Sequence, residues 1–513
     1  MMTTPSVTPC ARPSFGEEHF GPAYLGDKRR TRRLVDLANR FVRHPEGTLP
    51  QKCRDPNALR CCYDLINIPV VTHSAVLAPH VQRTIVTIDQ QDEVVLVLHD
   101  GTELDYSHVQ ALADQLGQIG TGSGRGYQCL NSLAVRPRDK AVLGLASQIL
   151  FKRPVAPKNE TRKQKQIRED RESLLWLQAV DRVEKATHQS RLRTVRPKGH
   201  PEPLVVDVID RGGDTFEFLD HEADLKRNYL IRSEHNREIA VGHDPASAAV
   251  ARAAKAKQKP KTVLRLHDHL RSLPEHGRRT IALSDRPERA ARSAEVAITW
   301  AAVRVYPPEQ PRGQHGEEPL PCWGVRVWEP NPPAGVEAVD WYLLTNVAVE
   351  TVKQAWERVD WYTIRWVIEE FHKGQKTGCS IEKPQVEKAA RLEPLIALLS
   401  VVALTLLGLR SDSRDESLQD RPATERVSEE YVEVLSGWRY QEKRALTVGE
   451  FFQALARLGG HQNRRSDKPP GWQVLWRGWM RLQAMVEGAR AMRCPKQTPP
   501  EPSPAEPTPT PTD

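Results

Sequence analysis

The chain has 513 residues, with 74 Lys and Arg against 66 Asp and Glu, which gives a net charge of +8. This length allows several domains, and the charge excess is too small to establish a nucleic-acid partner by itself. Eight cysteines are present without any CxxC pair. That spacing argues against a zinc ribbon or a disulfide framework and favours free thiols in a reducing cytosol.

The first 75 residues have a helical and basic pattern. In "DKRRTRRLVDLANRFVRHP", apolar residues recur at helical spacing from Leu34 to Phe41, and arginines occupy the other faces. Asp27 is placed to cap this helix. A second helical stretch follows in "DPNALRCCYDLIN". We therefore predict a small all-α domain over residues 1–75.

Strand and helix patterns alternate after this region. Strand candidates are "EVVLVLHD", which ends on Asp100, then "KAVLGLASQILFKRP", "EPLVVDVIDRGGD" with Asp210, and "NYLIRSEHNREI" with Arg232. The stretch "RESLLWLQAVDRVEKA" is typical of an amphipathic helix. Further strands are indicated between about residues 240 and 345. The pattern predicts an α/β fold with a mixed or parallel sheet and a β-rich insertion.

A second basic block falls within this α/β region. Residues 151–200 contain 14 basic and 6 acidic side chains, so this segment alone matches the excess of the whole chain. Local basic blocks in a nearly balanced protein suit a surface that contacts phosphates. A solvated charged face is the alternative.

Acidic residues follow two of the predicted strands. Asp100 and Asp210 each end an apolar run, and ligand sites assemble at that edge of α/β sheets. A single acid there is more often a turn or cap residue. Two such acids with a third on a helix favour a metal site, because carboxylate-bridged Mg²⁺ ions can bind both oxygens of a phosphodiester exchange. Asp105 is an alternative to Asp100, and Asp207 or Asp214 to Asp210.

The third acid lies in "WYTIRWVIEEFHKGQKTG", residues 361–378. At about 100° per residue, Tyr362, Arg365, Glu369 and Lys376 fall on one narrow stripe of a helix, and Glu370 lies off it. Arg365 and Glu369 alone would read as a surface ion pair, but a tyrosine and two lysines cannot all pair with one glutamate. Glu369 is therefore favoured as the third acid. Three apolar residues are expected to pack on the sheet: Trp366, Ile368 and Phe371.

The C-terminal part is helical in pattern. The 16-residue apolar run at 394–409 is shorter than the roughly 20 residues of a membrane span, so we expect a buried helix. Residues 385–493 are predicted as a helical domain. The last 20 residues, 494–513, contain eight prolines and are predicted as a disordered tail.

The spacing of Tyr362, Arg365, Glu369 and Lys376 resembles the Tyr-Arg-Glu-Lys signature of the IS-four family of bacterial insertion-sequence DDE transposases. "LHDGTELDYS" and "VIDRGGD" resemble the first-acid and second-acid motifs of this family, and "FGPAYLGDKRRTRRLVDLA" resembles its N-terminal DNA-binding signature. The matches keep the family order from about residue 15 to 410. Two departures, Gly101 for a common Thr and Gly212-Gly213 for Glu-Ala, leave the three candidate acids in place.

The resemblance implies a ribonuclease-H-like catalytic domain over residues 76–384, with its β-rich insertion at about 240–345. Asp100, Asp210 and Glu369 would be the catalytic acids and would hold two Mg²⁺ ions, with Mn²⁺ as a substitute. The implied activity is cut-and-paste transposition by nicking, hairpin formation and strand transfer. A binding-only inhibitor, an inactivated copy and a structure-specific nuclease are the alternatives.

The resemblance also implies a set of DNA contacts. Trp341 matches a tryptophan that stacks on a flipped base, a role that an aromatic platform can fill, and Arg232 matches an arginine near the DNA ends. Phosphate contacts are expected from Tyr362, Arg365, Lys373 and Lys376. Four N-terminal arginines are candidates for terminal-repeat recognition: Arg29, Arg30, Arg32 and Arg33.

The expected partners are double-stranded DNA, as transposon ends and target, and a second copy of the chain in a synaptic dimer formed by the C-terminal helices. No membrane association is expected. The implied location is the bacterial cytoplasm, at the nucleoid.

Overall fold

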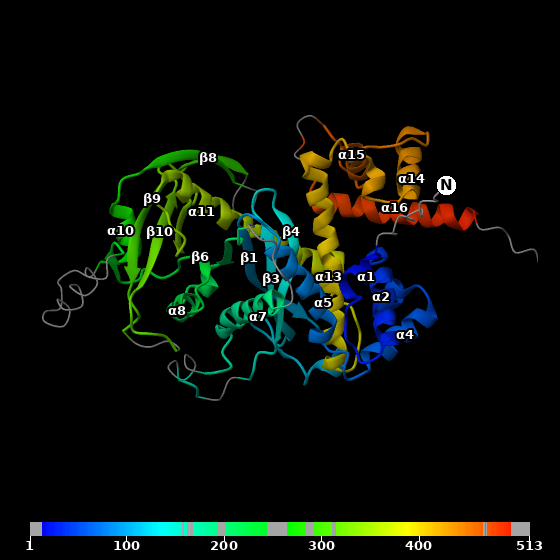
Figure 1. The fold of residues 1–513 in the computed structure, drawn as a ribbon, viewed down its shortest axis with the longest axis horizontal. Coiled ribbons are helices and arrows are strands. Elements are labelled where there is room, and N and C mark those ends of the chain that lie inside the picture. The colour runs from blue at the N-terminus through cyan, green and yellow to red at the C-terminus, as the bar shows by residue number, and fades with distance from the viewer. Residues whose placement is uncertain are drawn as a thin grey trace, which may run out of the picture. The chain divides into compact units, whose positions relative to one another are not determined.

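The structure is a computed structural model, and its fold is drawn in Figure 1. It describes residues 13–155, 159–161, 164, 168–192, 201–243, 264–283, 291–309, 314–464, 467 and 469–493. The predicted proline-rich tail lies outside these residues. The chain divides into two compact units, residues 1–411 and 412–513. The boundary falls after residue 411 rather than near residue 385.

The first unit begins with five helices: α1 (Phe15–Phe20), α2 (Lys28–Arg43), α3 (Leu49–Cys53), α4 (Pro56–Ile66) and α5 (His73–Asp89). Asp27 caps α2 by accepting a hydrogen bond from the Arg29 amide at 2.7 Å, as predicted. The apolar face of α2 is buried over Leu34, Leu37, Ala38 and Phe41. The helical reading of this region is confirmed.

Five strands form the first part of the sheet: β1 (Val95–Asp105), β3 (Arg125–Arg136), β4 (Ala141–Phe151), β5 (Val205–Ile209) and β6 (Asn228–Arg232). Their order is β4-β3-β1-β5-β6. The strands β4, β3 and β1 are antiparallel, whereas β1, β5 and β6 are parallel. The short β2 (Gly117–Gln118) pairs with β3.

Two helices cover one face of this part of the sheet (Figure 1). They are α5 and α7 (Leu174–Arg191), which place Ile85, Ile88 and Val183 against Val97 and Ala146 of the strands. The helix predicted from "RESLLWLQAVDRVEKA" is thereby confirmed. Its apolar face is buried because it packs on β3 and β4.

The strands expected near residues 240–345 are present: β7 (Ile239–Val241), β8 (Gly277–Leu283), β9 (Arg292–Val305), β10 (Leu320–Trp328) and β11 (Asp340–Thr345). They do not form a separate sheet. β11 pairs antiparallel with β6 through Leu343–Arg232 and Leu344–Ile231, so one 11-stranded sheet runs through both regions. The helices α8 (Phe216–Asp224) and α10 (Leu266–Ser272) share its apolar core.

The segment predicted as one helix is broken. It forms α11 (Val352–Ile364), α12 (Trp366–Lys373) and a π-helical turn (Gly374–Gly378). At the break, the Arg365 amide donates to the Tyr362 carbonyl and the Ile368 amide to the Arg365 carbonyl, at 3.1 and 3.0 Å. These bonds span three residues and tighten the turn.

The break changes which side chains of this segment are buried. Ile368 and Phe371 are fully buried, as expected. Trp366 was expected on the same side but is 45% exposed, so that expectation was wrong. It occupies the first position after the tightened turn, where the regular helical stripe is interrupted.

The apolar run at 394–409 lies in α13 (Ala389–Arg414), whose apolar residues are mostly buried. Among the described residues, α13 is the one helix long and apolar enough to cross a membrane. Burial of most of its apolar stretch is the behaviour of a core helix. The buried-helix prediction is confirmed.

The second unit is helical, with α14 (Glu429–Tyr440), α15 (Val448–Leu458) and α16 (Trp472–Arg493). α15 and α16 approach closely next to Gly459. A Cβ there would lie 2.0 Å from the Val474 carbonyl oxygen, so only glycine fits.

A buried lysine joins the N-terminal helices to the segment after the π-helical turn. Lys52 of α3 is fully buried and donates to the carbonyls of Pro45 and Cys379, the second at 2.8 Å. The Gly47 amide also donates to the Ser380 hydroxyl at 3.1 Å. Burial lowers the pKa of Lys52 to about 8. The two carbonyls give this buried cation its hydrogen-bond partners.

Lys52→Met therefore tests the buried charge. Below pH 8 the lysine is protonated in both states, and the folded state bears the cost of burying it. Between the folded pKa of about 8 and the ordinary value of 10.5, the folded state loses its proton first, so stability rises with pH. From pH 7.5 to 9.5, we expect wild type to gain roughly 2 kcal/mol relative to Lys52→Met in urea unfolding. A difference in unfolding free energy between wild type and Lys52→Met that does not change with pH would contradict this.

Candidate active site and DNA-binding surface

Strand register brings the first two predicted acids to the same level of the sheet. The parallel pairing of β1 with β5 ends at Leu98 and Val208, and Asp100 and Asp210 each lie two residues further. The sequence suggested that Asp100 ends its strand. In the structure β1 instead continues beside β3 to Asp105. What ends before Asp100 is only the pairing with β5. The two carboxylates therefore lie where β1 and β5 separate.

Arg365 links the first acid to the third. Its guanidinium donates to Asp100 and to Glu369, each at 2.8 Å. Burial raises the pKa of Asp100 to about 6; Arg365 opposes this, and the nearby charges of Asp210 and Glu369 add to it. The structure thus brings Asp100, Asp210 and Glu369 within electrostatic reach of one another around a single arginine.

These residues suit a hard divalent cation by their chemistry. All three are carboxylates, the ligand type that Mg²⁺ prefers, and their mutual repulsion is one cause of the raised pKa of Asp100. In the part of the chain that the structure describes, no three Asp, Glu, His or Cys side chains are grouped closely enough to hold a metal ion. Arg365 pairs with two of the acids, so its guanidinium has to move if both are to bind a cation.

Asp207, one alternative to Asp210, is committed to a buried network. It is fully buried and accepts hydrogen bonds from His99 Nε2 at 2.8 Å and from Arg227 Nε at 2.8 Å. His99 Nδ1 lies 2.9 Å from the Ser132 hydroxyl. Burial opposes ionisation, but Arg227 and His99 hold the pKa of Asp207 below its usual range. Sequence reasoning missed this network, although His99 directly precedes Asp100.

The other alternative acids also have partners. Asp214 is buried, accepts from the amides of Glu234 and His235 at 2.6 and 2.9 Å, and pairs with Arg237. Asp105 caps the turn at Ser107, and Glu370 forms an ion pair with Arg410 of α13. Asp210 instead caps a short 3-10 turn at Gly212 and stays partly exposed.

Three residues assigned to DNA contact lie together on different elements. The Arg232 guanidinium of β6 lies over the ring of Trp341 of β11, 5.5 Å from its centre. That ring meets Tyr362 of α11 edge-on at 6.1 Å. Burial raises the pKa of Tyr362, while Arg365 and Arg232 oppose the rise. This aromatic and cationic cluster is therefore next to the acids.

The two predicted lysines lie further along the same segment. Lys373 Nζ is 5.7 Å from the ring centre of Trp366. Lys376, in the π-helical turn, is 3.6 Å from Glu382. Both keep their ammonium groups near the surface, where a phosphate can approach.

The four N-terminal arginines differ in what they contact. Arg29 pairs with Asp27 at 3.0 Å, and Arg30 Nη1 donates to the Leu25 carbonyl at 3.0 Å. Arg32 and Arg33 are exposed and, within the described residues, form no hydrogen bond or ion pair. The Arg30 side chain is therefore engaged in a hydrogen bond within the domain, while Arg32 and Arg33 are available to a partner.

Residues 12–71 match the family model of transposase DNA-binding domains. The match covers α1 to α4 and includes all four arginines. The N-terminal helices thus match a DNA-binding domain of the transposase type, which supports a transposase with DNA as a partner.

Replacing Asp207 should destabilise the protein far more than replacing Asp210. Asp207→Asn leaves the buried Arg227 without its main counter-charge and should lower the free energy of unfolding by about 3–5 kcal/mol. Asp210→Asn keeps the oxygen that caps Gly212 and should cost less than about 1 kcal/mol. Chemical unfolding followed by circular dichroism measures both. Equal losses would contradict the structural role of Asp207.

Proposed function

We propose that this protein is a DDE transposase of the IS-four family that moves an insertion sequence by cut-and-paste transposition. The observation that carries the proposal is the convergence of Asp100, Asp210 and Glu369, from β1, the end of β5 and α12, around Arg365. The transposase-type DNA-binding domain on the same chain supports it.

The proposed catalytic core is ribonuclease-H-like. An antiparallel group of strands, β4-β3-β1, continues into the parallel strands β5 and β6, and the acids lie where β1 and β5 separate. The helix with the third acid packs beside β1. This arrangement supports a catalytic domain near residues 76–384, with the β-rich strands as its insertion.

Asp100, Asp210 and Glu369 would hold two Mg²⁺ ions, or Mn²⁺ in their place. When bound, such ions activate an attacking oxygen and neutralise the charge that develops on the leaving oxygen of a phosphodiester. The protein's own contribution is to keep three carboxylates on rigid elements. Arg365 balances two of them until the DNA and the cations arrive.

Other side chains would orient the DNA. Tyr362, Arg365, Lys373 and Lys376 are placed to contact phosphates beside the bond to be cut, which positions a strand without reading its sequence. Trp341, with Arg232 over its ring, offers a platform for an unstacked base at the transposon end.

The same proposal includes nicking, hairpin formation at the transposon end and strand transfer to target DNA. The C-terminal helices would pair two copies in a synaptic complex at the bacterial nucleoid. A second candidate is a binding-only protein or an inactivated copy, which is favoured by the pairing of Arg365 with two of the three acids. Cleavage separates the two candidates.

Glu369→Gln tests the catalytic proposal, with Glu370→Gln as its matched control on the next residue. Glu369→Gln should bind terminal-repeat DNA like wild type and lose Mg²⁺-dependent cleavage by on the order of 10⁴-fold. Glu370→Gln alters an ion pair with Arg410 and should cut within a few-fold of wild type. Gel-shift and nicking assays on the same duplex measure both.

Three outcomes would overturn this assignment in different ways. Cleavage by Glu369→Gln would remove Glu369 from the catalytic set. A wild type that binds DNA but never cuts it would establish the binding-only candidate. A wild type that cuts but gives no strand-transfer product from a pre-cleaved end would point to a structure-specific nuclease.

A further inference from the structure

One aromatic side chain of the DNA-binding domain is exposed to an unusual degree. Tyr24 lies in the turn between α1 and α2, and it is 89% exposed. Its neighbours Ala23 and Leu25 are buried. Since the side chains on both sides are anchored in the domain, the tyrosine ring between them is directed outward.

The turn that carries Tyr24 is held by α2 on both sides. The Thr31 hydroxyl donates to the Ala23 carbonyl at 2.9 Å, and Arg30 Nη1 donates to the Leu25 carbonyl at 3.0 Å. Gly26 completes the turn with a φ of +77°, a conformation that glycine adopts without strain. The backbone around Tyr24 is therefore fixed before any partner binds, which lowers the entropy cost of an interaction through the ring.

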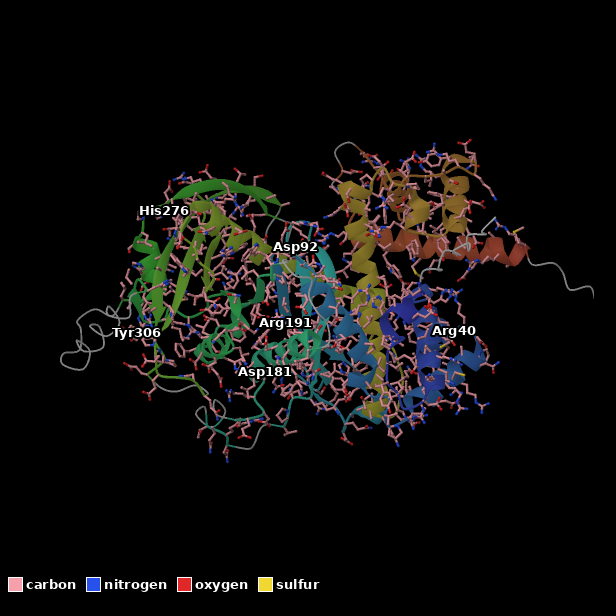
Figure 2. The ribbon with its side chains drawn as sticks, in the orientation of Figure 1. Arg40, Asp92, Asp181, Arg191, His276 and Tyr306 are labelled. Carbon is pink, nitrogen blue, oxygen red and sulfur yellow. The ribbon has the colours of Figure 1, made fainter. Side chains whose placement is uncertain are left out.

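Two cationic side chains line the groove beside this ring. Lys28 and Arg32 line the same surface groove as Tyr24, and Arg33 is exposed on the adjoining face of α2. Arg40, in the second half of α2 (Figure 2), instead contacts the Cys53 carbonyl at 3.2 Å and Asp55 at 3.7 Å. The available positive charge is thus concentrated in the first half of α2, next to Tyr24.

Acidic side chains limit where a phosphate can lie. Glu17, Asp27 and Asp36 line the groove with Tyr24. Glu17 is hydrogen-bonded to Ser14 and Asp27 to Arg29, so both carboxylates stay within the domain. Their charge disfavours a phosphate inside the groove and favours one on the Arg32 and Arg33 side.

We infer that Tyr24 is a DNA-contacting residue whose ring packs on a base or deoxyribose of duplex DNA, while Arg32 and Arg33 hold the adjacent phosphates. This inference rests on the DNA-binding function of the N-terminal domain and adds a contact to it. Phosphate contacts set the position of a protein on a duplex but do not distinguish sequences. A rigid aromatic ring beside them adds apolar contact with the groove, which depends on the bases present.

Tyr24→Ala in the full chain tests this contact, with Tyr24→Phe and Tyr63→Ala as controls. Tyr63 lies on α4 of the same domain and is 37% exposed. The probes are a duplex with the sequence that flanks the gene and a scrambled duplex of equal length. Tyr24→Ala should weaken binding to the first by about tenfold or more, whereas Tyr24→Phe and Tyr63→Ala should stay within about threefold.

The salt dependence of binding separates the ring from the arginines. Tyr24→Ala should leave the slope of log Kd against log salt unchanged, because no phosphate contact is lost. Arg32→Ala or Arg33→Ala should reduce that slope by about one and weaken both duplexes alike. Thermal melting should match wild type for Tyr24→Ala, since the ring is exposed.

Several results would overturn the inference. Binding of Tyr24→Ala equal to that of wild type would exclude the contact. Equal losses in Tyr24→Phe and Tyr24→Ala would assign the effect to the hydroxyl group and overturn the role of the ring. If wild type binds neither duplex, the DNA-binding function itself fails, and the Tyr24 contact fails with it.

Discussion

The parallel pairing of β1 with β5 determines the geometry of the whole candidate site. Because it ends at Leu98 and Val208, Asp100 and Asp210 leave the paired region at the same level. β6 continues this register, with Ile231 opposite Ile209, so Arg232 and Asp210 each directly follow the last paired residue of their strand. A shift of one residue in either strand would turn these side chains to the opposite face. The DNA chemistry proposed for this protein therefore depends on a few backbone hydrogen bonds.

Charge balance is the second constraint on this site. Three carboxylates and the buried hydroxyl of Tyr362 surround Arg365, which is the shared counter-charge in the structure. The raised pKa of Asp100 reflects its burial as well as its acidic neighbours. Under the proposed function, cations would replace the arginine beside the acids, and a DNA phosphate would be the new partner of the released guanidinium.

Buried polar groups beneath the site hold its elements in place. The chain Ser132–His99–Asp207–Arg227 connects β3, β1 and β5 with the start of β6. Each member has a hydrogen-bond partner, as buried polar groups require. Lys52 likewise connects the DNA-binding domain with the segment after the π-helical turn, through hydrogen bonds to backbone carbonyls in both. These polar and charged residues hold the strand register and the docking of the N-terminal helices.

Much of this protein follows from local sequence. Apolar spacing predicted the buried face of α2, and Asp27 was correctly predicted as its cap, because these features depend on neighbours within a few residues. The contact of Arg365 with Glu369 is the i,i+4 ion pair that the sequence offered as the alternative to a metal site. Other features needed the tertiary structure. Asp207 differs from Asp210 only through distant partners, Arg30 differs from Arg32 through a folded turn, and Trp366 is exposed by a break between two helices. Such outcomes depend on contacts between residues that are distant in the chain. Helical or strand periodicity is a local pattern and does not specify those contacts.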